Sequence, residues 1–102
     1  MNEISPRASG LPDCSAYEGP DFPAKKKVLL LNDDFTTQDF VVAVLMLIFH
    51  KSGEEAVALM ETVHRTGKGY VGEYPYDIAA TKCAQVRKAA KERGFPLRCI
   101  LE

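Results

Sequence analysis

Three stretches of the chain carry the hydrophobic pattern of β-strands. Residues 28–31 form a continuous apolar run that ends at turn-forming residues, which is typical of a buried strand. Residues 69–74 combine aromatic and β-branched side chains and are closed by a proline, so they predict a second strand. Residues 95–102 alternate apolar and polar side chains over most of their length, which predicts a third strand with one buried face.

Apolar residues at helical spacing occupy the segments between these strands. The spacing predicts a helix over 38–51 whose apolar side chains lie nearly all round, so this helix must be buried on more than one side. A second helix begins at the capping box of residues 52–55 and ends at Gly67. A third helix covers 76–93, carries basic residues near its end, and stops at Gly94.

The elements follow one another in the order strand, helix, helix, strand, helix, strand. This order predicts an α+β fold in which a three-stranded antiparallel sheet packs against three helices on one of its faces. Residues 1–24 hold four of the six prolines and few apolar side chains, so we expect a disordered N-terminal arm there. We therefore assign residues 25–102 to a single folded domain.

The charge of the chain is distributed unevenly between these two parts. The whole chain has 13 Lys+Arg and 14 Asp+Glu, a formal net charge of −1. Residues 1–24 have four acidic residues and one basic residue, or −3, which leaves +2 for residues 25–102. A total this close to neutral argues against a general nucleic-acid-binding protein, which would normally carry a basic excess.

The composition also indicates in which cellular compartment we expect the protein. No apolar run approaches the roughly 18 residues needed to span a bilayer, and the first residues lack the pattern of a signal peptide. Cys14, Cys83 and Cys99 have no metal-ligand spacing. We therefore expect a small cytoplasmic protein with reduced thiols and no cofactor.

Polar residues with candidate chemistry occur at two places. Asn32, Asp33 and Asp34 follow the first predicted strand, and His64 lies at the end of the second predicted helix. Each has an ordinary structural role there, because Asn and Asp commonly end strands and a histidine is favoured in a last helical turn. Together, however, amide, carboxylate and imidazole groups share the ability to accept hydrogen bonds from an ammonium group.

Two other functions stay open from the residues alone. Asp33, Asp34 and His64 could serve a small metal-dependent hydrolase, although transition-metal sites usually contain more nitrogen or sulfur ligands. The basic end of the third helix could contact nucleic acid. The spacing supports no Ser-His-Asp or Cys-His pairing and no glycine-rich phosphate loop, so we expect a protein without catalytic activity.

Four blocks of residues 25–102 resemble, in order, the blocks of the ClpS family. They are VLLLNDDFTTQDFVVAVL, ALMETVHRTGKG, AATKCAQVRKAA and FPLRCILE. That family comprises adaptors that hand N-degron substrates to the Clp protease, and its fold has the element order predicted above. The resemblance implies a module that captures proteins with a free N-terminal Leu, Phe, Tyr or Trp and delivers them to a ClpA- or ClpC-type AAA+ unfoldase.

The resemblance also implies roles for individual residues. The substrate's α-amino group would be bound by Asn32, Asp34 and His64, with Asp33 and Thr36 shaping the same rim. The hydrophobic pocket would be formed by Leu30, Gln38, Val41, Met60, Val63 and Leu97. The unfoldase would contact Asp77 and Lys82. The arm over residues 1–24 would match the family extension that enters the unfoldase during delivery.

One pocket position departs from the family pattern. The family often has a methionine that acts as a gate on the pocket where this chain has Gln38, and Thr37 replaces a frequent proline. We expect the polar gate to change the selection among bulky side chains. The resemblance further implies a monomer in the bacterial cytoplasm, with the plastid stroma as the other compartment, and neither nucleic-acid nor membrane partners.

Overall fold

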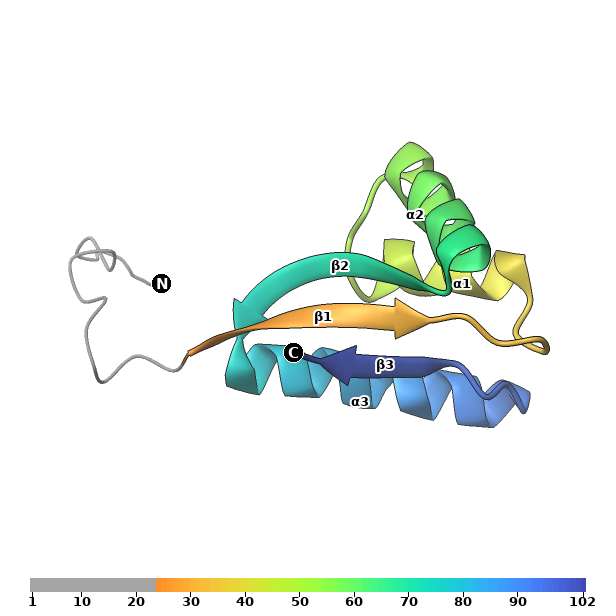
Figure 1. Ribbon diagram of the computed structural model, residues 1–102. Helices are drawn as coiled ribbons and strands as arrows, with labels where there is room; N and C mark the ends of the chain where they lie inside the picture. The colour runs from red at the N-terminus through yellow and green to blue at the C-terminus, as the bar shows by residue number, and fades with distance from the viewer. Residues whose placement is uncertain (1–23) are drawn as a thin grey trace, which may run out of the picture.

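The computed structural model describes residues 24–102, so all but the last residue of the predicted arm lies outside the described residues. The chain forms the elements predicted from the sequence, in the predicted order (Figure 1). They are β1 (Lys25–Leu31), α1 (Gln38–Leu47), α2 (Gly53–Thr66), β2 (Lys68–Pro75), α3 (Tyr76–Arg93) and β3 (Arg98–Leu101). The predicted α+β class is therefore confirmed.

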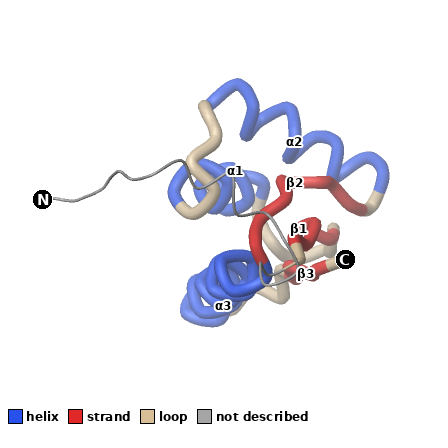
Figure 2. Tube along the Cα trace, turned by 90° about the vertical axis from the view of Figure 1, so that its left-hand side faces the viewer, coloured by secondary structure: helices blue, strands red, loops and turns tan. Residues whose placement is uncertain are grey.

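The three strands form one antiparallel sheet in the order β2-β1-β3. β1 is the central strand, and its register joins Leu30 to Gly69 on one side and to Cys99 on the other. Seen end-on, α1 and α3 lie to one side of the sheet, while α2 lies beside β2 and packs against α1 (Figure 2). The central position of β1 explains why its sequence is the most continuously apolar of the three strands.

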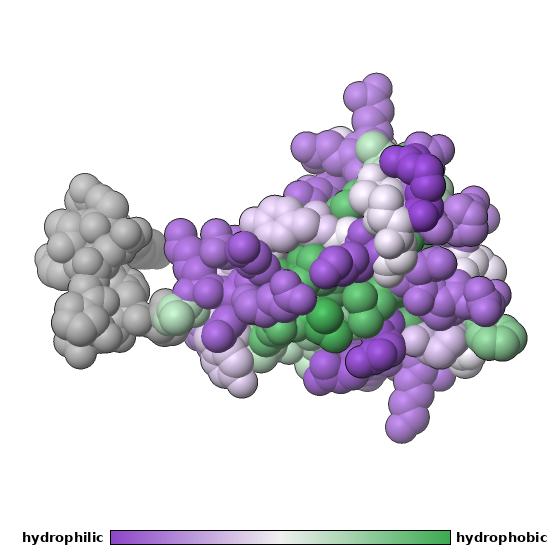
Figure 3. All heavy atoms as spheres, in the orientation of Figure 1, coloured by the Kyte–Doolittle hydropathy of each residue, from purple (hydrophilic) through white to green (hydrophobic). Residues whose placement is uncertain are grey.

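The hydrophobic core lies between the sheet and the helices. Val28 and Leu30 of β1 are fully buried there, together with side chains from all three helices. Leu29 is also buried and its β3 partner Ile100 is half-buried, but neither belongs to this cluster between the sheet and the helices. On the face of the sheet turned away from α3, hydrophobic side chains form a patch surrounded by hydrophilic ones (Figure 3). The apolar side chains of β1 thus lie on both faces of the sheet, only one of which is covered by helices.

The first helix ends four residues before the expected boundary at residue 51. α1 stops at Leu47, and His50 adopts a left-handed backbone conformation with φ of 58°. The carbonyl of Ile48 accepts a hydrogen bond from Nζ of Lys82, 2.8 Å away on α3. Phe49 is buried beyond the end of the helix, where its ring lies 6.3 Å from that of Tyr74. Because residues 48–49 are apolar, the helical pattern in the sequence continues past Leu47. In the structure the chain leaves the helix there and contacts α3.

The other predicted helix ends are confirmed. Ser52 and Glu55 form the reciprocal capping box, each side chain accepting from the other's backbone N–H at 3.1 Å. α2 and α3 end at Gly67 and Gly94, which have φ of 94° and 75° and so occupy the left-handed region that favours glycine. Thr37 is the N-cap of α1, since its hydroxyl accepts from the backbone N–H of Phe40 at 3.2 Å.

The strands differ from the predicted ranges at their ends only. β1 begins at Lys25 because Lys25, Lys26 and Lys27 pair with Pro75, Tyr74 and Glu73 of β2. β3 begins at Arg98, so Leu97 precedes the strand. Within residues 24–102, no helix combines the length and hydropathy needed to cross a bilayer.

Two of the three cysteines meet inside the core. Cys83 of α3 and Cys99 of β3 are free cysteines whose sulfur atoms lie 2.6 Å apart. Burial, together with the hydrogen bond that it shares with Cys83, raises the pKa of the Cys99 thiol well above its usual range. This pair joins α3 to β3 inside the core. Cys14 lies outside the described residues.

Candidate functional site

The loop that leaves β1 begins with a hydrogen bond to the end of α2. The backbone N–H of Asn32 donates to the carbonyl of Gly67 at 2.9 Å. The N–H of Gly67 in turn donates to the carbonyl of Val63, also at 2.9 Å. Because β1 and α2 are joined in this way, the Asn32 side chain and the last turns of α2 are held on the same side of the molecule. Asn32 and Gly67, which are 35 positions apart in the sequence, are thus brought together.

Asp33 organises the rest of this loop. Its carboxylate accepts from the backbone N–H groups of Phe35 and Thr36 at 2.8 and 2.7 Å, and from the Thr36 hydroxyl at 2.7 Å. Partial burial raises the pKa of Asp33, but the hydrogen bonds from Thr36 and Phe35 outweigh it and leave this pKa below its usual value. Asp33 is therefore an ionised carboxylate that holds the loop, and its oxygens are occupied by the chain itself.

A glycine in β2 sets the distance between α2 and the sheet. Gly69 is buried, and a Cβ atom at this position would lie 2.5 Å from Cγ2 of Val63 and 2.9 Å from Cδ1 of Leu59. Only a residue without a side chain allows such a close approach. The contact brings Val63 and the neighbouring His64 of α2 toward the end of β1.

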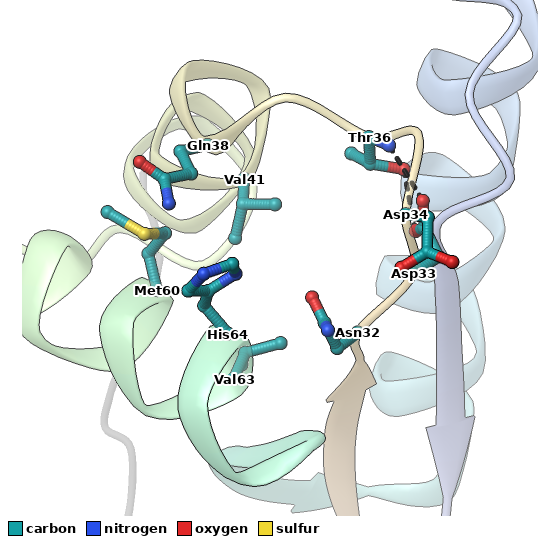
Figure 4. A pocket seen from close by; sticks show the side chains of 9 residues that line it. All are labelled: Asn32, Asp33, Asp34, Thr36, Gln38, Val41, Met60, Val63 and His64. Carbon is teal, nitrogen blue, oxygen red and sulfur yellow. Dashed lines mark hydrogen bonds between the residues drawn. The ribbon is translucent and has the colours of Figure 1, made fainter.

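These elements enclose one cavity of about 190 Å³ between the loop, α1 and α2. Its lining has a polar part and an apolar part (Figure 4). The polar part consists of Asn32, Asp33, Asp34, Thr36, Gln38 and His64. The apolar part consists of Val41, Met60 and Val63, all buried. Every residue that lines the cavity is among those that the family resemblance implied, although the loop and α2 are far apart along the chain.

Leu30 and Leu97, which were expected in the same pocket, do not line the cavity. Leu30 is fully buried in the centre of the sheet, and its side chain belongs to the core beneath. Leu97 lies before β3 and lines a separate hollow with Arg87 and Phe95 at the end of α3. Asp77 and Lys82 lie in the first half of α3, which begins at the other end of the sheet from Asn32 (Figure 1).

The polar groups at the mouth of the cavity differ in what they contact. Asn32, Asp34 and His64 are exposed, and none of their side chains has a hydrogen-bond partner within residues 24–102. An amide oxygen, a carboxylate and an unprotonated imidazole nitrogen are hydrogen-bond acceptors, so this mouth suits a cationic donor such as an ammonium group. The adjoining apolar wall suits a hydrocarbon or aromatic group carried by the same ligand.

A metal site would need its ligands closer together. In the part of the chain that the structure describes, no group of three or more His, Cys, Asp or Glu residues could hold a metal ion. Asp33, Asp34 and His64 border the same cavity, but Asp33 is committed to its own loop. The geometry therefore does not favour the hydrolase alternative.

The comparisons with known proteins agree with this fold and this cavity. Residues 22–100 match the family model described as ATP-dependent Clp protease adaptor protein ClpS. The adapter proteins ClpS of Wolinella succinogenes and Treponema denticola are 59% and 61% identical to the chain over 80 residues, covering 78% of it and 78% and 79% of their own lengths. The solved structure of Agrobacterium tumefaciens ClpS2 bound to L-phenylalaninamide is 41% identical, with a TM-score of 0.76, and covers 78% of this chain and 96% of its own.

The family model spans most of the chain, and the relatives are similar along most of their own lengths. The solved relative carries the same fold at a sequence identity well above the level at which fold alone would be shared. The chain therefore belongs to the ClpS family, the non-catalytic adaptor proteins of the ATP-dependent Clp protease.

Proposed function

We propose that the cavity binds the free N-terminal residue of a substrate protein whose first side chain is bulky and hydrophobic. The observation that carries this proposal is the combination of hydrogen-bond acceptors at the mouth with an apolar wall inside one cavity. Asn32, Asp34 and His64 would accept from the α-ammonium group, while Val41, Met60 and Val63 would surround the side chain. Asp33 and Thr36 would act indirectly, by holding the loop that presents Asn32 and Asp34.

The expected interaction energies are consistent with reversible capture. A free α-amino group has a pKa of roughly 8 and is mostly cationic at neutral pH. Each charge-assisted hydrogen bond contributes about 1.5–3 kcal/mol, and burial of a large apolar side chain contributes about 1.5–3 kcal/mol. Association costs about 4–15 kcal/mol, so three such hydrogen bonds and one buried side chain leave at most about 8 kcal/mol, which corresponds to micromolar or weaker dissociation constants.

The ligand of the solved relative has the chemistry that this cavity would recognise. L-phenylalaninamide, bound by the Agrobacterium tumefaciens protein, combines a free α-amino group with a benzyl side chain. Its carboxyl-terminal amide stands where the next peptide bond of a protein would begin. A substrate of the present chain would place the same two groups against the polar mouth and the apolar wall.

The test is a pair of peptides that begin with phenylalanine and differ only in acetylation of the α-amino group. We expect the free peptide to bind with roughly micromolar affinity and the acetylated peptide to bind at least tenfold more weakly, because acetylation removes the charge and two donors. Fluorescence anisotropy of labelled peptides measures both affinities. Equal binding of the two peptides would show that the polar mouth does not recognise an amine.

The surface that would meet a Clp AAA+ unfoldase of the ClpA or ClpC type is the start of α3. Asp77 is exposed there between Tyr76 and Ile78, whose side chains are 53% and 45% exposed. Exposed aromatic and aliphatic side chains beside a charge are typical of a protein–protein contact. Lys82 also has a role within the chain, because it binds the carbonyl at the end of α1 and lies over the rings of Phe49 and Tyr74.

A further inference from the structure

An apolar groove lies between α1 and α2. Its floor is formed by Val42 and Met46 of α1 and by Val57 and Ala58 of α2. The side chains of Met46 and Val57 are 41% and 42% exposed. Large side chains of this kind in one groove mark a surface that a partner covers more often than a surface left to solvent.

The groove begins where the candidate cavity ends. Gln38 of α1 and Met60 of α2 face each other at the side of the cavity (Figure 4). Val42 lies one helical turn after Gln38, and Val57 lies one turn before Met60. Because residues three or four positions apart share a helix face, the groove continues the line of the cavity along both helices.

The charged residues that line the groove are both acidic. They are Glu54 and Glu61 on α2, and both are exposed. They are seven positions apart on the helix, so they lie about 10 Å apart on one side of it. An extended peptide spans about 3.3 Å per residue, and the groove therefore matches the length of some three or four peptide residues.

We propose that this groove binds the residues that follow the N-terminal residue of a substrate and prefers apolar and basic side chains among them. The inference rests on the proposed function, because the first residue in the cavity would direct the next residues to the mouth. Apolar side chains would cover Val42, Met46 and Val57, and lysine or arginine would lie against Glu54 and Glu61. The adaptor would thus recognise a short segment of the substrate as well as its first residue.

The test uses peptides that share a free N-terminal phenylalanine and a leucine at position 2 and carry either two lysines or two glutamates at positions 3 and 5. The groove variant is Glu54→Gln with Glu61→Gln, and the matched control is Glu73→Gln with Glu92→Gln, which changes the net charge equally at exposed positions on β2 and α3. L-phenylalaninamide is the probe for the cavity alone. Thermal melting of each variant confirms that the fold is intact.

We expect the unmodified chain to bind the lysine peptide about fivefold more tightly than the glutamate peptide at low salt. The difference should shrink to less than twofold in the groove variant, persist in the control variant, and weaken with added salt. L-phenylalaninamide should bind all three proteins equally. A lysine preference that is absent, or that is as large in the groove variant as in the control, overturns the inference.

The same measurements distinguish a failure of this inference from a failure of the proposed function. If the free and acetylated phenylalanine peptides differ while the lysine and glutamate peptides do not, the cavity recognises the amine and the groove does not bind the following residues. If acetylation has no effect, the proposed function fails and the inference fails with it.

Discussion

Three consecutive polar residues after β1 have three different surroundings. Asp33 accepts three hydrogen bonds from the loop, whereas Asp34 has no side-chain partner within residues 24–102. Asn32 is attached through its backbone to the end of α2, which leaves its side chain at the cavity. At the scale of single residues, one carboxylate builds the loop while its neighbours are presented to a ligand.

This division of roles predicts the effect of removing one ligand-facing group at a time. Asp34→Ala and His64→Ala should each weaken binding of a phenylalanine peptide by about tenfold, since each removes one charge-assisted hydrogen bond. The melting temperature should change little, because both side chains are exposed. Arg65→Ala, at an exposed neighbour that does not line the cavity, serves as the control and should leave affinity unchanged. A large loss of thermal stability in either variant would instead assign that residue a structural role.

Gln38 is the residue at which the substrate range should be most adjustable. It lies opposite Met60 at the side of the cavity, where a polar amide meets an otherwise apolar wall (Figure 4). Gln38→Met should tighten binding of peptides that begin with leucine or phenylalanine by about three- to tenfold, because a flexible thioether adds apolar contact. Anisotropy titrations with peptides that differ only in the first residue measure the change. An unaltered order of preference would show that this position does not act as a gate.

At the scale of elements, the site depends on how closely α2 approaches β2. Gly69 leaves room for Val63 and Leu59 against the strand, and the N–H of Asn32 binds the carbonyl of Gly67 at the end of the same helix. α2 is therefore fixed to the sheet at its C-terminal end, close to the cavity. Its N-terminal end is capped within its own first turn, by the capping box of Ser52 and Glu55.

Gly69→Ala should move α2 outward. The added Cβ would meet Val63 and Leu59 well inside van der Waals contact, so we expect a loss of about 1–3 kcal/mol in unfolding free energy and weaker peptide binding. Gly53→Ala is the matched control, because nothing lies within 4 Å of a Cβ at that position. Chemical denaturation gives the stability of both variants. Equal stability of the two variants would mean that α2 can shift without cost.

At the scale of the whole molecule, the cavity and the start of α3 lie at opposite ends of the sheet. Asn32 follows the C-terminal end of β1, whereas Lys25 at its other end pairs with Pro75, directly before α3. A substrate in the cavity would therefore leave the proposed unfoldase surface uncovered. The predicted N-terminal arm enters the fold beside that surface, at Lys25.

This arrangement predicts that capture and delivery can be separated. A chain that begins at Ala24 should bind phenylalanine peptides with unchanged affinity and should lose most of its stimulation of substrate degradation by a Clp protease. Binding is measured by anisotropy, and delivery by the degradation rate of a fluorescent protein that begins with phenylalanine. The full chain carrying Asp77→Lys should also bind peptide normally and deliver poorly. Full delivery by the shortened chain would remove the role proposed for the arm.

Local patterns in the sequence determined the element order, the capping box at Ser52 and the glycine stops at Gly67 and Gly94, because each depends on residues within one or two turns. The resemblance to a known family supplied the residues that line the cavity. It also placed Leu30 there, although this side chain lies in the core.

Only the tertiary structure decided how the faces of the elements are used. An apolar run such as that of β1 does not show which side chains face the core, and that choice follows from helices covering one face of the sheet. The end of α1 depends on Lys82, 34 residues away, which binds the carbonyl of Ile48. The groove between α1 and α2 likewise exists only because two helices pack side by side, which no local pattern along the chain can specify.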